Sequence, residues 1–417
     1  MKIRMTILAV AGAALTSTPA VADTVCEWVD FAQAIQLSAA PPPNTPRVPD
    51  HDRAQTQVAL AMFEALNAID RRYESYLGFP VGNAKASQDA AAATAAYKVL
   101  SAHYPSQKTA LDESYGITME QISDVAARDS GKAIGEAAAA AALKVGQLDP
   151  AVTIVPYAPR TAAGTWVPTQ LPVIEPFSTA FKPWILPRAD AVRPSPPPAL
   201  TDARWVESYD EVKRLGARQS KERTPFQTLM ARYRITPNMM PSFRMAADAR
   251  GRRPVENARM FALLGMIGDD ANVAISDAKL HYNYWRPITA IRNGASDGND
   301  ATAADPAWEP LIATPNHPEY PCAHCIFAAG TAEVMKAEVG NAPSAGVRVA
   351  SRSIPNAAVQ ALPSWDEWVK QVSFSRTLGG VHYRFSNEAG EEMGRKIAGM
   401  AMANVMRPLP KTVKKKP

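Results

Sequence analysis

The chain has 417 residues, of which 47% are hydrophobic, enough to bury a large core in one large domain or two smaller ones. Its formal net charge of +5 falls to +3 when Lys2 and Arg4 are removed with an N-terminal signal. This weak basic excess gives no indication of a nucleic-acid partner.

The first 22 residues are typical of a secretory signal peptide. Lys2 and Arg4 give the positive start, residues 7–15 the apolar centre, and Ala20-Val21-Ala22 a small-residue cleavage site. The apolar run is too short to cross a bilayer, and no later stretch is long enough without charges or prolines. We therefore predict an exported protein, periplasmic or secreted, with no transmembrane span.

Residues 23–200 are predicted to form an N-terminal helical bundle and a proline-rich wrapping segment. Residues 23–50 are expected to be irregular, and helices are predicted over 53–73, 86–104, 106–115 and 119–145. The last of these is alanine-dense, which favours close helix packing. Twelve of the 36 prolines lie in residues 150–198, where we expect the chain to dock on the helical body through Trp166, Phe177, Phe181 and Trp184.

Residues 201–406 are predicted to form a C-terminal helical bundle. Thr201 is predicted to be an N-cap with Asp202 in the first turn, and Ser364 and Glu367 have the spacing of a capping box. Helices are expected over about 201–218, 224–233, 253–286, 323–338, 364–372 and 387–406, and residues 407–417 form a basic tail. No strand pattern of any length appears, so the predicted fold class is all-α, with two fused helical bundles.

Three short stretches of the C-terminal bundle carry candidate functional residues. In the first, Lys279 and Arg286 are seven residues apart, which predicts that both project from one face of the helix 253–286, about 10 Å apart along its axis. Tyr282, Tyr284 and Trp285 beside Arg286 indicate partial burial of the guanidinium. The pair alone is equally compatible with two solvated cations on a surface helix.

The second stretch, Pro318 to Cys325, contains Pro321-Cys322-Ala323-His324 at the predicted start of a helix. The backbone N–H groups of Cys322 and Ala323 are predicted to face an anion there, with His324 beside it as a proton-transfer residue. Cys322 and Cys325 are three apart, within disulfide range on a helix. A thiol redox function of this pair is a further alternative, although it would leave the cations and histidines unexplained.

The third stretch contains Arg376 and His382, six residues apart. On a straight helix they would diverge by about 120°, but Gly379-Gly380 between them can bend the chain so that both face one point. His382 is then a candidate nucleophile or a ligand to the central atom of an oxyanion. Together the three stretches supply three cations and two histidines, a set suited to phosphate or vanadate.

The spacing of these residues resembles the signature of the type 2 phosphatidic acid phosphatase and vanadium-dependent haloperoxidase superfamily, K-x6-R-P, P-S-G-H and S-R-x5-H. Lys279, Arg286 and Pro287 match the first part, and Ser375, Arg376 and His382 match the third. Sequence from His51 to the last helix resembles the exported bacterial haloperoxidase-like branch.

The resemblance implies a role for each matching residue. Lys279, Arg286 and Arg376 would bind the equatorial oxygens, with Cys322 and Ala323 at the remaining oxyanion-binding positions. His324 would be the acid–base residue, and His382 would bond the vanadium of vanadate or attack phosphorus. The implied function is a vanadate-dependent haloperoxidase using hydrogen peroxide and a halide. The alternative is an acid phosphatase that needs no metal and forms a phosphohistidine on a small phosphoester.

Three departures from the signature keep a third reading open, that of a non-catalytic oxyanion binder. Cys322 replaces a serine donor with a weaker thiol, and Ala323 replaces glycine. Ser386 stands four residues after His382, where the family often has an acid that orients the imidazole; Glu388 is a candidate substitute. The apolar bundle faces and the wrapping segment would also suit a homodimer.

Overall fold

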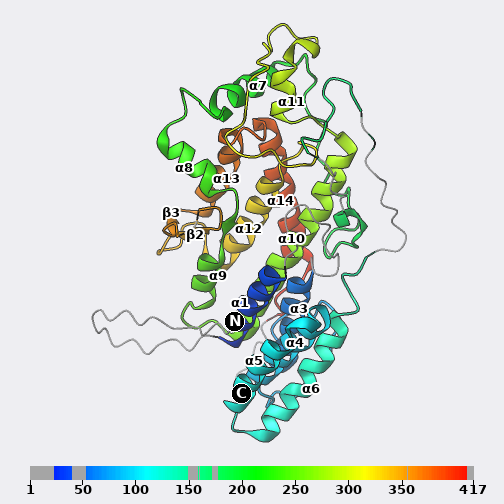
Figure 1. Ribbon diagram of the computed structural model, residues 1–417. Coiled ribbons are helices and arrows are strands. Elements are labelled where there is room, and N and C mark those ends of the chain that lie inside the picture. Colours follow the sequence, from blue (N-terminus) through cyan, green and yellow to red (C-terminus); the bar gives the residue numbers. More distant parts are fainter. Residues whose placement is uncertain are drawn as a thin grey trace, which may run out of the picture.

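The computed structural model describes residues 23–39, 53–148, 158, 160–170, 177–354 and 356–410. Within this part, the chain forms two helical bundles that share the long helix α10, together with one small sheet (Figure 1). The predicted all-α fold class is confirmed, while the predicted signal peptide and residues 411–417 of the basic tail lie outside the described residues. The α-helices are α1 (Thr24–Ser38), α3 (Ala54–Ile69), α4 (Gln88–His103), α5 (Lys108–Glu120), α6 (Val125–Ala142), α7 (Ala203–Gly216), α8 (Pro225–Tyr233), α9 (Met240–Ala247), α10 (Pro254–Tyr282), α11 (Pro287–Arg292), α12 (Ala323–Val339), α13 (Trp365–Leu378) and α14 (Arg384–Asn404), with short 3-10 turns η1 (Pro105–Gln107), η2 (Phe177–Ala180) and η3 (Gly294–Ser296).

The N-terminal bundle packs α3, α4, α5 and α6, drawn in blue to cyan in Figure 1. The alanine-dense helix α6 approaches α4 closely, as its composition predicts. A Cβ atom built at Gly131 would lie 2.4 Å from Ser87 O, and one at Gly135 would lie 2.4 Å from Ala91 O. Only small residues permit this backbone approach, so the helix seam is fixed by sequence.

The C-terminal bundle packs α12 against α10, α13 and α14. Helix α10 is 29 residues long and also contacts α3, so one hydrophobic core continues from the first bundle into the second. Leu60, Met266, Ile326 and Ile397, one from each of four helices, are all fully buried in it. None of the described helices is long and apolar enough to cross a membrane.

Two predictions about helices are wrong, the irregular structure expected before residue 50 and the N-cap residue of α7. Residues 24–38 form helix α1, because the prolines that suggested irregular structure begin only at Pro41, and Val25, Trp28 and Ile35 bury one face. The N-cap of α7 is Asp202, not Thr201, and its carboxylate accepts a 2.8 Å hydrogen bond from Arg204 N. A carboxylate binds the free N–H groups more strongly than a hydroxyl does.

A small antiparallel sheet in the order β1 (Pro237–Asn238), β2 (Val347–Ser351) and β3 (Gln360–Leu362) was not predicted. Pro237 pairs with Ser351, and Val347 pairs with Leu362. Strands of two to five residues are too short to show alternation in the sequence. The sheet lies beside α9 and α13 and holds the segment after α8 in place.

The wrapping segment docks on the helical body as predicted at Trp166, Phe181 and Trp184, all buried, whereas the side chain of Phe177 lies outside the described residues. Asp270 of α10 anchors it: Oδ1 accepts from Trp184 N at 2.7 Å, and Oδ2 accepts from the next two backbone N–H groups at 2.7 and 2.8 Å. One buried carboxylate thus satisfies three backbone donors that would otherwise lack partners.

Candidate active site

The first stretch is arranged differently from the prediction of two cations on one helix. Helix α10 ends at Tyr282, with Asn283 in the left-handed conformation at φ 43°, so Lys279 lies in its last turn and Arg286 lies beyond it as the N-cap residue of α11. Asparagine tolerates positive φ, which explains why the helix stops before Pro287. Both cations nevertheless reach the same place, a backbone strap formed by residues 317–319.

Hydrogen bonds to this strap hold both cations. Lys279 Nζ donates to Pro318 O at 2.8 Å and to Glu319 O at 2.6 Å. Arg286 Nε donates to His317 O at 3.0 Å, and Nη2 contacts His317 Nδ1 at 3.0 Å. Lys279 and Arg286 are buried, so these carbonyl dipoles are part of what compensates two desolvated charges.

Arg376 lies near the end of α13 and differs from the other two cations. Its side chain is 2% exposed, and its Nε and Nη1 atoms have no hydrogen-bond partner. Burial, and next the charge of Arg286, lowers the pKa of Arg376 to about 9. A buried guanidinium with free donors is the feature that a bound anion would satisfy.

The third stretch bends at its two glycines, as predicted. Gly380 adopts φ 77° after α13 ends at Leu378, and the turn places His382 between α13 and α14. A Cβ at Gly380 would also lie 2.5 Å from Gly216 O, so both backbone conformation and packing require glycine here.

A carboxylate that the sequence did not single out orients His382. Glu319 Oε1 lies 2.7 Å from His382 Nδ1, and Arg286 Nη1 lies 3.1 Å from His382 Nε2. The guanidinium of Arg286 can only donate a hydrogen bond. Nδ1 therefore carries the proton in the neutral ring, and the Nε2 lone pair faces Arg286. Glu388 does not substitute for the missing acid, because it is exposed and pairs with Arg204 at 2.6 Å; Ser386 Oγ is 3.5 Å from Nδ1.

His324, also from the second stretch, lies on the first turn of α12. Its Nε2 lies 2.9 Å from Ile235 O, so Nε2 carries the proton and Nδ1 offers the lone pair. Burial, and next the charge of Arg376, lowers the pKa of His324 to about 3. His324 is therefore neutral without an anion, and its sensitivity to Arg376 places the two groups near each other.

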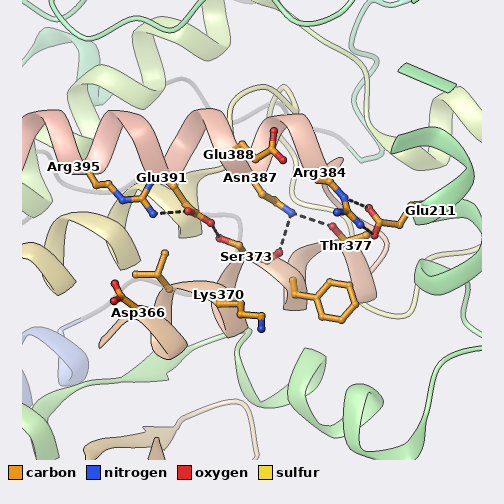
Figure 2. A pocket seen from close by; sticks show the side chains of 12 residues that line it. Glu211, Asp366, Lys370, Ser373, Thr377, Arg384, Asn387, Glu388, Glu391 and Arg395 are labelled. Carbon is orange, nitrogen blue, oxygen red and sulfur yellow. Dashed lines mark hydrogen bonds and ion pairs between the residues drawn. The ribbon is translucent and has the colours of Figure 1, made fainter. Parts of the chain in front are cut away.

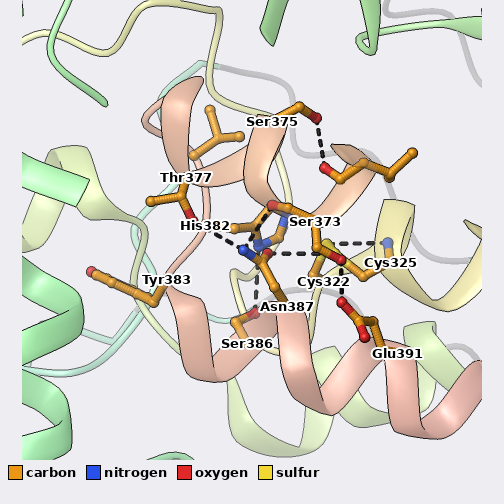
Figure 3. The surroundings of a disulfide bond; sticks show 12 residues. Cys322, Cys325, Ser373, Ser375, Thr377, His382, Tyr383, Ser386, Asn387 and Glu391 are labelled. Atoms are coloured by element: carbon orange, nitrogen blue, oxygen red, sulfur yellow. Dashed lines mark hydrogen bonds between the residues drawn. A yellow bond between two sulfur atoms is a disulfide. The ribbon is translucent and has the colours of Figure 1, made fainter. Parts of the chain in front are cut away.

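The two cysteines of the second stretch form a disulfide rather than free thiols. Cys322 and Cys325 are bonded, with their Cα atoms 5.4 Å apart, and His382, Ser386 and Asn387 are among the surrounding residues (Figure 3). Both half-cystines are fully buried. Burial and the absence of an exposed thiolate argue against the thiol-exchange alternative.

Burial of several ionisable groups characterises this site. Lys279, Arg286 and Arg376 are buried, as is the carboxylate Glu319, and burial lowers the pKa of all three cationic groups. Burial raises the pKa of Glu319 to about 7, although the charges of Arg286 and Lys279 lower it. Burial, with Arg286 and Lys279, holds the pKa of His382 well below its usual value. A bound anion would stabilise the charged forms of the cationic side chains, and the free donors of Arg376 fit such a group.

Two residues of this site were missed by sequence reasoning. Glu319 lies within the second stretch and His317 just before it, but neither has a spacing that marks it as a partner of His382 or Arg286. The available signal was the carboxylate of Glu319, two residues before Pro321. The chain has Ser386 at the position where the family often has an acid, so another carboxylate was needed to orient His382. Only the strap geometry brings it to Nδ1.

Comparisons with known proteins agree with this geometry. Residues 259–410 match a family model described as the VCPO second helical-bundle domain. A bacterial vanadium-dependent iodoperoxidase superposes with a TM-score of 0.75 at 18% identity, covering 93% of this chain and 97% of that chain. The holo-type and apo-type bacterial vanadium-dependent chloroperoxidases give TM-scores of 0.64 and 0.63 at 17% and 18% identity, covering 92% and 87% of this chain and 93% and 95% of theirs. No curated protein sequence matches the chain.

The fold is therefore that of the bacterial vanadium haloperoxidases, and the matched domain contains every residue of the three stretches. The resemblance to the vanadium haloperoxidase and type 2 phosphatidic acid phosphatase superfamily is confirmed.

Proposed function

We propose that this chain is a vanadate-dependent haloperoxidase-like enzyme that uses hydrogen peroxide to oxidise a halide. The observation that carries the proposal is the buried guanidinium of Arg376, whose Nε and Nη1 donors are free beside two further buried cations. Tetrahedral vanadate has the charge and the acceptor oxygens to satisfy them. When bound, it would supply an electrophilic centre that activates peroxide.

The chain's own residues would do the rest of the work. Glu319 accepts a hydrogen bond from Nδ1–H of His382 and so leaves the proton-free Nε2, now 3.1 Å from Arg286 Nη1, as the atom that would bind the oxyanion. Arg376, Lys279 and Arg286 neutralise the oxygens. His324, with its proton on Nε2, presents Nδ1 as the base for the proton of an incoming nucleophile. Burial of the cationic side chains strengthens each of these interactions.

An acid phosphatase is the second candidate, and the orientation of His382 favours it. Nε2 would attack phosphorus and the ester oxygen would leave with a proton from His324, whose pKa a bound dianion would raise. Water would then release phosphate from the phosphohistidine. Here the oxyanion is the substrate, and the same residues bind it.

We further propose that the protein works outside the cytoplasm. The Cys322–Cys325 disulfide supports this, because such bonds persist in oxidising compartments.

Titrating the purified protein with vanadate by calorimetry tests the leading proposal. Stoichiometric binding that is lost in His382→Ala and kept in His281→Ala, an exposed histidine, together with peroxide-dependent halide oxidation, is the expected result. Binding without oxidation, with phosphate released from small esters, would favour the phosphatase. Binding without either activity would mean a non-catalytic oxyanion binder.

A further inference from the structure

The disulfide occupies the N-terminus of α12, beside the proposed oxyanion site. Cys322 is the N-cap residue, and its Sγ accepts a 3.2 Å hydrogen bond from Cys325 N. One residue pair thus both caps the helix and closes a covalent ring around its first turn. The backbone N–H groups of Ala323 and His324 belong to the part of a helix that has no carbonyl partner within the helix.

A notch in α14 seats this turn. A Cβ atom built at Gly390 would lie 2.4 Å from Cys322 O and 3.1 Å from Cys325 Cβ. Cys322 N also donates to Ser386 O at 3.1 Å. Helix α14 therefore fixes the position of the first turn of α12 relative to His382, which lies two residues before α14 begins.

Asn387 connects the disulfide to α13. Its Oδ1 lies 3.4 Å from Cys325 Sγ, while its Nδ2 donates to Ser373 O at 2.9 Å and to Thr377 Oγ1 at 3.0 Å. These three polar residues also line a surface cavity of about 610 Å³ between α13 and α14 (Figure 2). Thr377 follows Arg376 directly, so the disulfide turn and the unpaired guanidinium are tied to one hydrogen-bonded unit.

We propose that the Cys322–Cys325 disulfide is a positioning element of the oxyanion site. It holds the first turn of α12 so that the backbone N–H groups of Ala323 and His324 are available as donors to a bound anion. The free Nε and Nη1 donors of Arg376 independently indicate an anion near this turn. The inference rests on the proposed oxyanion-binding function.

Two double variants separate positioning from general stabilisation. Cys322→Ala with Cys325→Ala removes both the cap and the cross-link, and Cys322→Ser with Cys325→Ala restores a cap but not the cross-link. Vanadate and phosphate affinity are measured by calorimetry, and unfolding temperature in parallel. Cys26→Ala, which removes the buried free cysteine, is the matched control.

The expected result is a loss of anion affinity of at least about tenfold in the alanine pair, the size of one lost hydrogen bond to a charged group. The serine variant should also bind more weakly than the wild type, by at least about threefold, because a hydroxyl caps the helix but cannot cross-link its first turn. Affinity of either variant within about twofold of the wild type would overturn the proposal, because the cross-link would then not be needed.

A glycine pair on α14 tests the same idea with the disulfide intact. Gly390→Ala should push the turn away and weaken vanadate binding, whereas Gly399→Ala, which meets no atom within 4 Å, should not. Thiol labelling of the unfolded, unreduced variants should find one free cysteine in each. If the wild type binds vanadate and Gly390→Ala binds it equally well, the inference fails and the proposed function stands. If the wild type binds neither anion, both fail.

Discussion

The pairing of Glu319 with His382 predicts a specific loss of activity. Replacing Glu319 with alanine leaves the buried Nδ1–H of His382 without its acceptor at 2.7 Å. A hydrogen bond to a charged group contributes about 1.5–3 kcal/mol, so the rate should fall roughly 10- to 150-fold. Glu319→Gln keeps an acceptor oxygen without the charge and should lose less. Halide oxidation by vanadate-loaded protein, or ester hydrolysis, measures the effect.

The same carboxylate predicts opposite pH effects on rate and on anion affinity. Burial raises the pKa of Glu319 to about 7, so its charge is lost as pH falls through that value. The wild-type rate should then fall, because the acceptor of Nδ1–H becomes neutral, whereas sulfate affinity should rise, because the site gains positive charge. Glu319→Gln should show neither step.

Stability without an anion provides an independent check on the carboxylate. The folded protein holds the Glu319 proton up to about pH 7, while the unfolded chain releases it near the ordinary glutamate pKa of 4.5. The free energy of unfolding should therefore fall by about 3 kcal/mol as pH rises across this window, and Glu319→Gln should lack this fall. Rates of Glu319→Ala within about twofold of the wild type, with an unchanged pH profile in Glu319→Gln, would refute the assignment.

Two further substitutions test the site and the scaffold separately. Arg376→Lys keeps the charge but loses the planar donors, so vanadate affinity measured by calorimetry should fall roughly 10- to 100-fold. The unfolding temperature should stay within error, because Nε and Nη1 of Arg376 have no protein partner. Unchanged affinity would contradict the proposed binding mode. Asp270→Ala removes the acceptor of three backbone N–H groups in the wrapping segment and should lower the free energy of unfolding, measured by denaturant titration, by roughly 3–5 kcal/mol. The control is Asp277→Ala, which removes a half-buried partner of Arg193 and should lower it less.

Local sequence was sufficient where structure depends on local chemistry. Helical periodicity and capping residues located most helices of both bundles, and Gly380 marked the bend that turns His382 toward Arg286. Fixed spacing also selected Lys279, Arg376 and His382, all of which are buried in the structure. Periodicity and φ preference act within a few residues, so they are readable without knowledge of the fold.

Tertiary structure decided what depends on chain reversal. The sequence predicted Lys279 and Arg286 on one helix, but the left-handed Asn283 separates them, and it is the strap 317–319 that brings them together. Glu319 reaches His382 across 63 residues, and Asp270 reaches Trp184 across 86. Such contacts form because a buried charge or donor must find a partner wherever the packed chain offers one, and no spacing rule in the sequence specifies that partner.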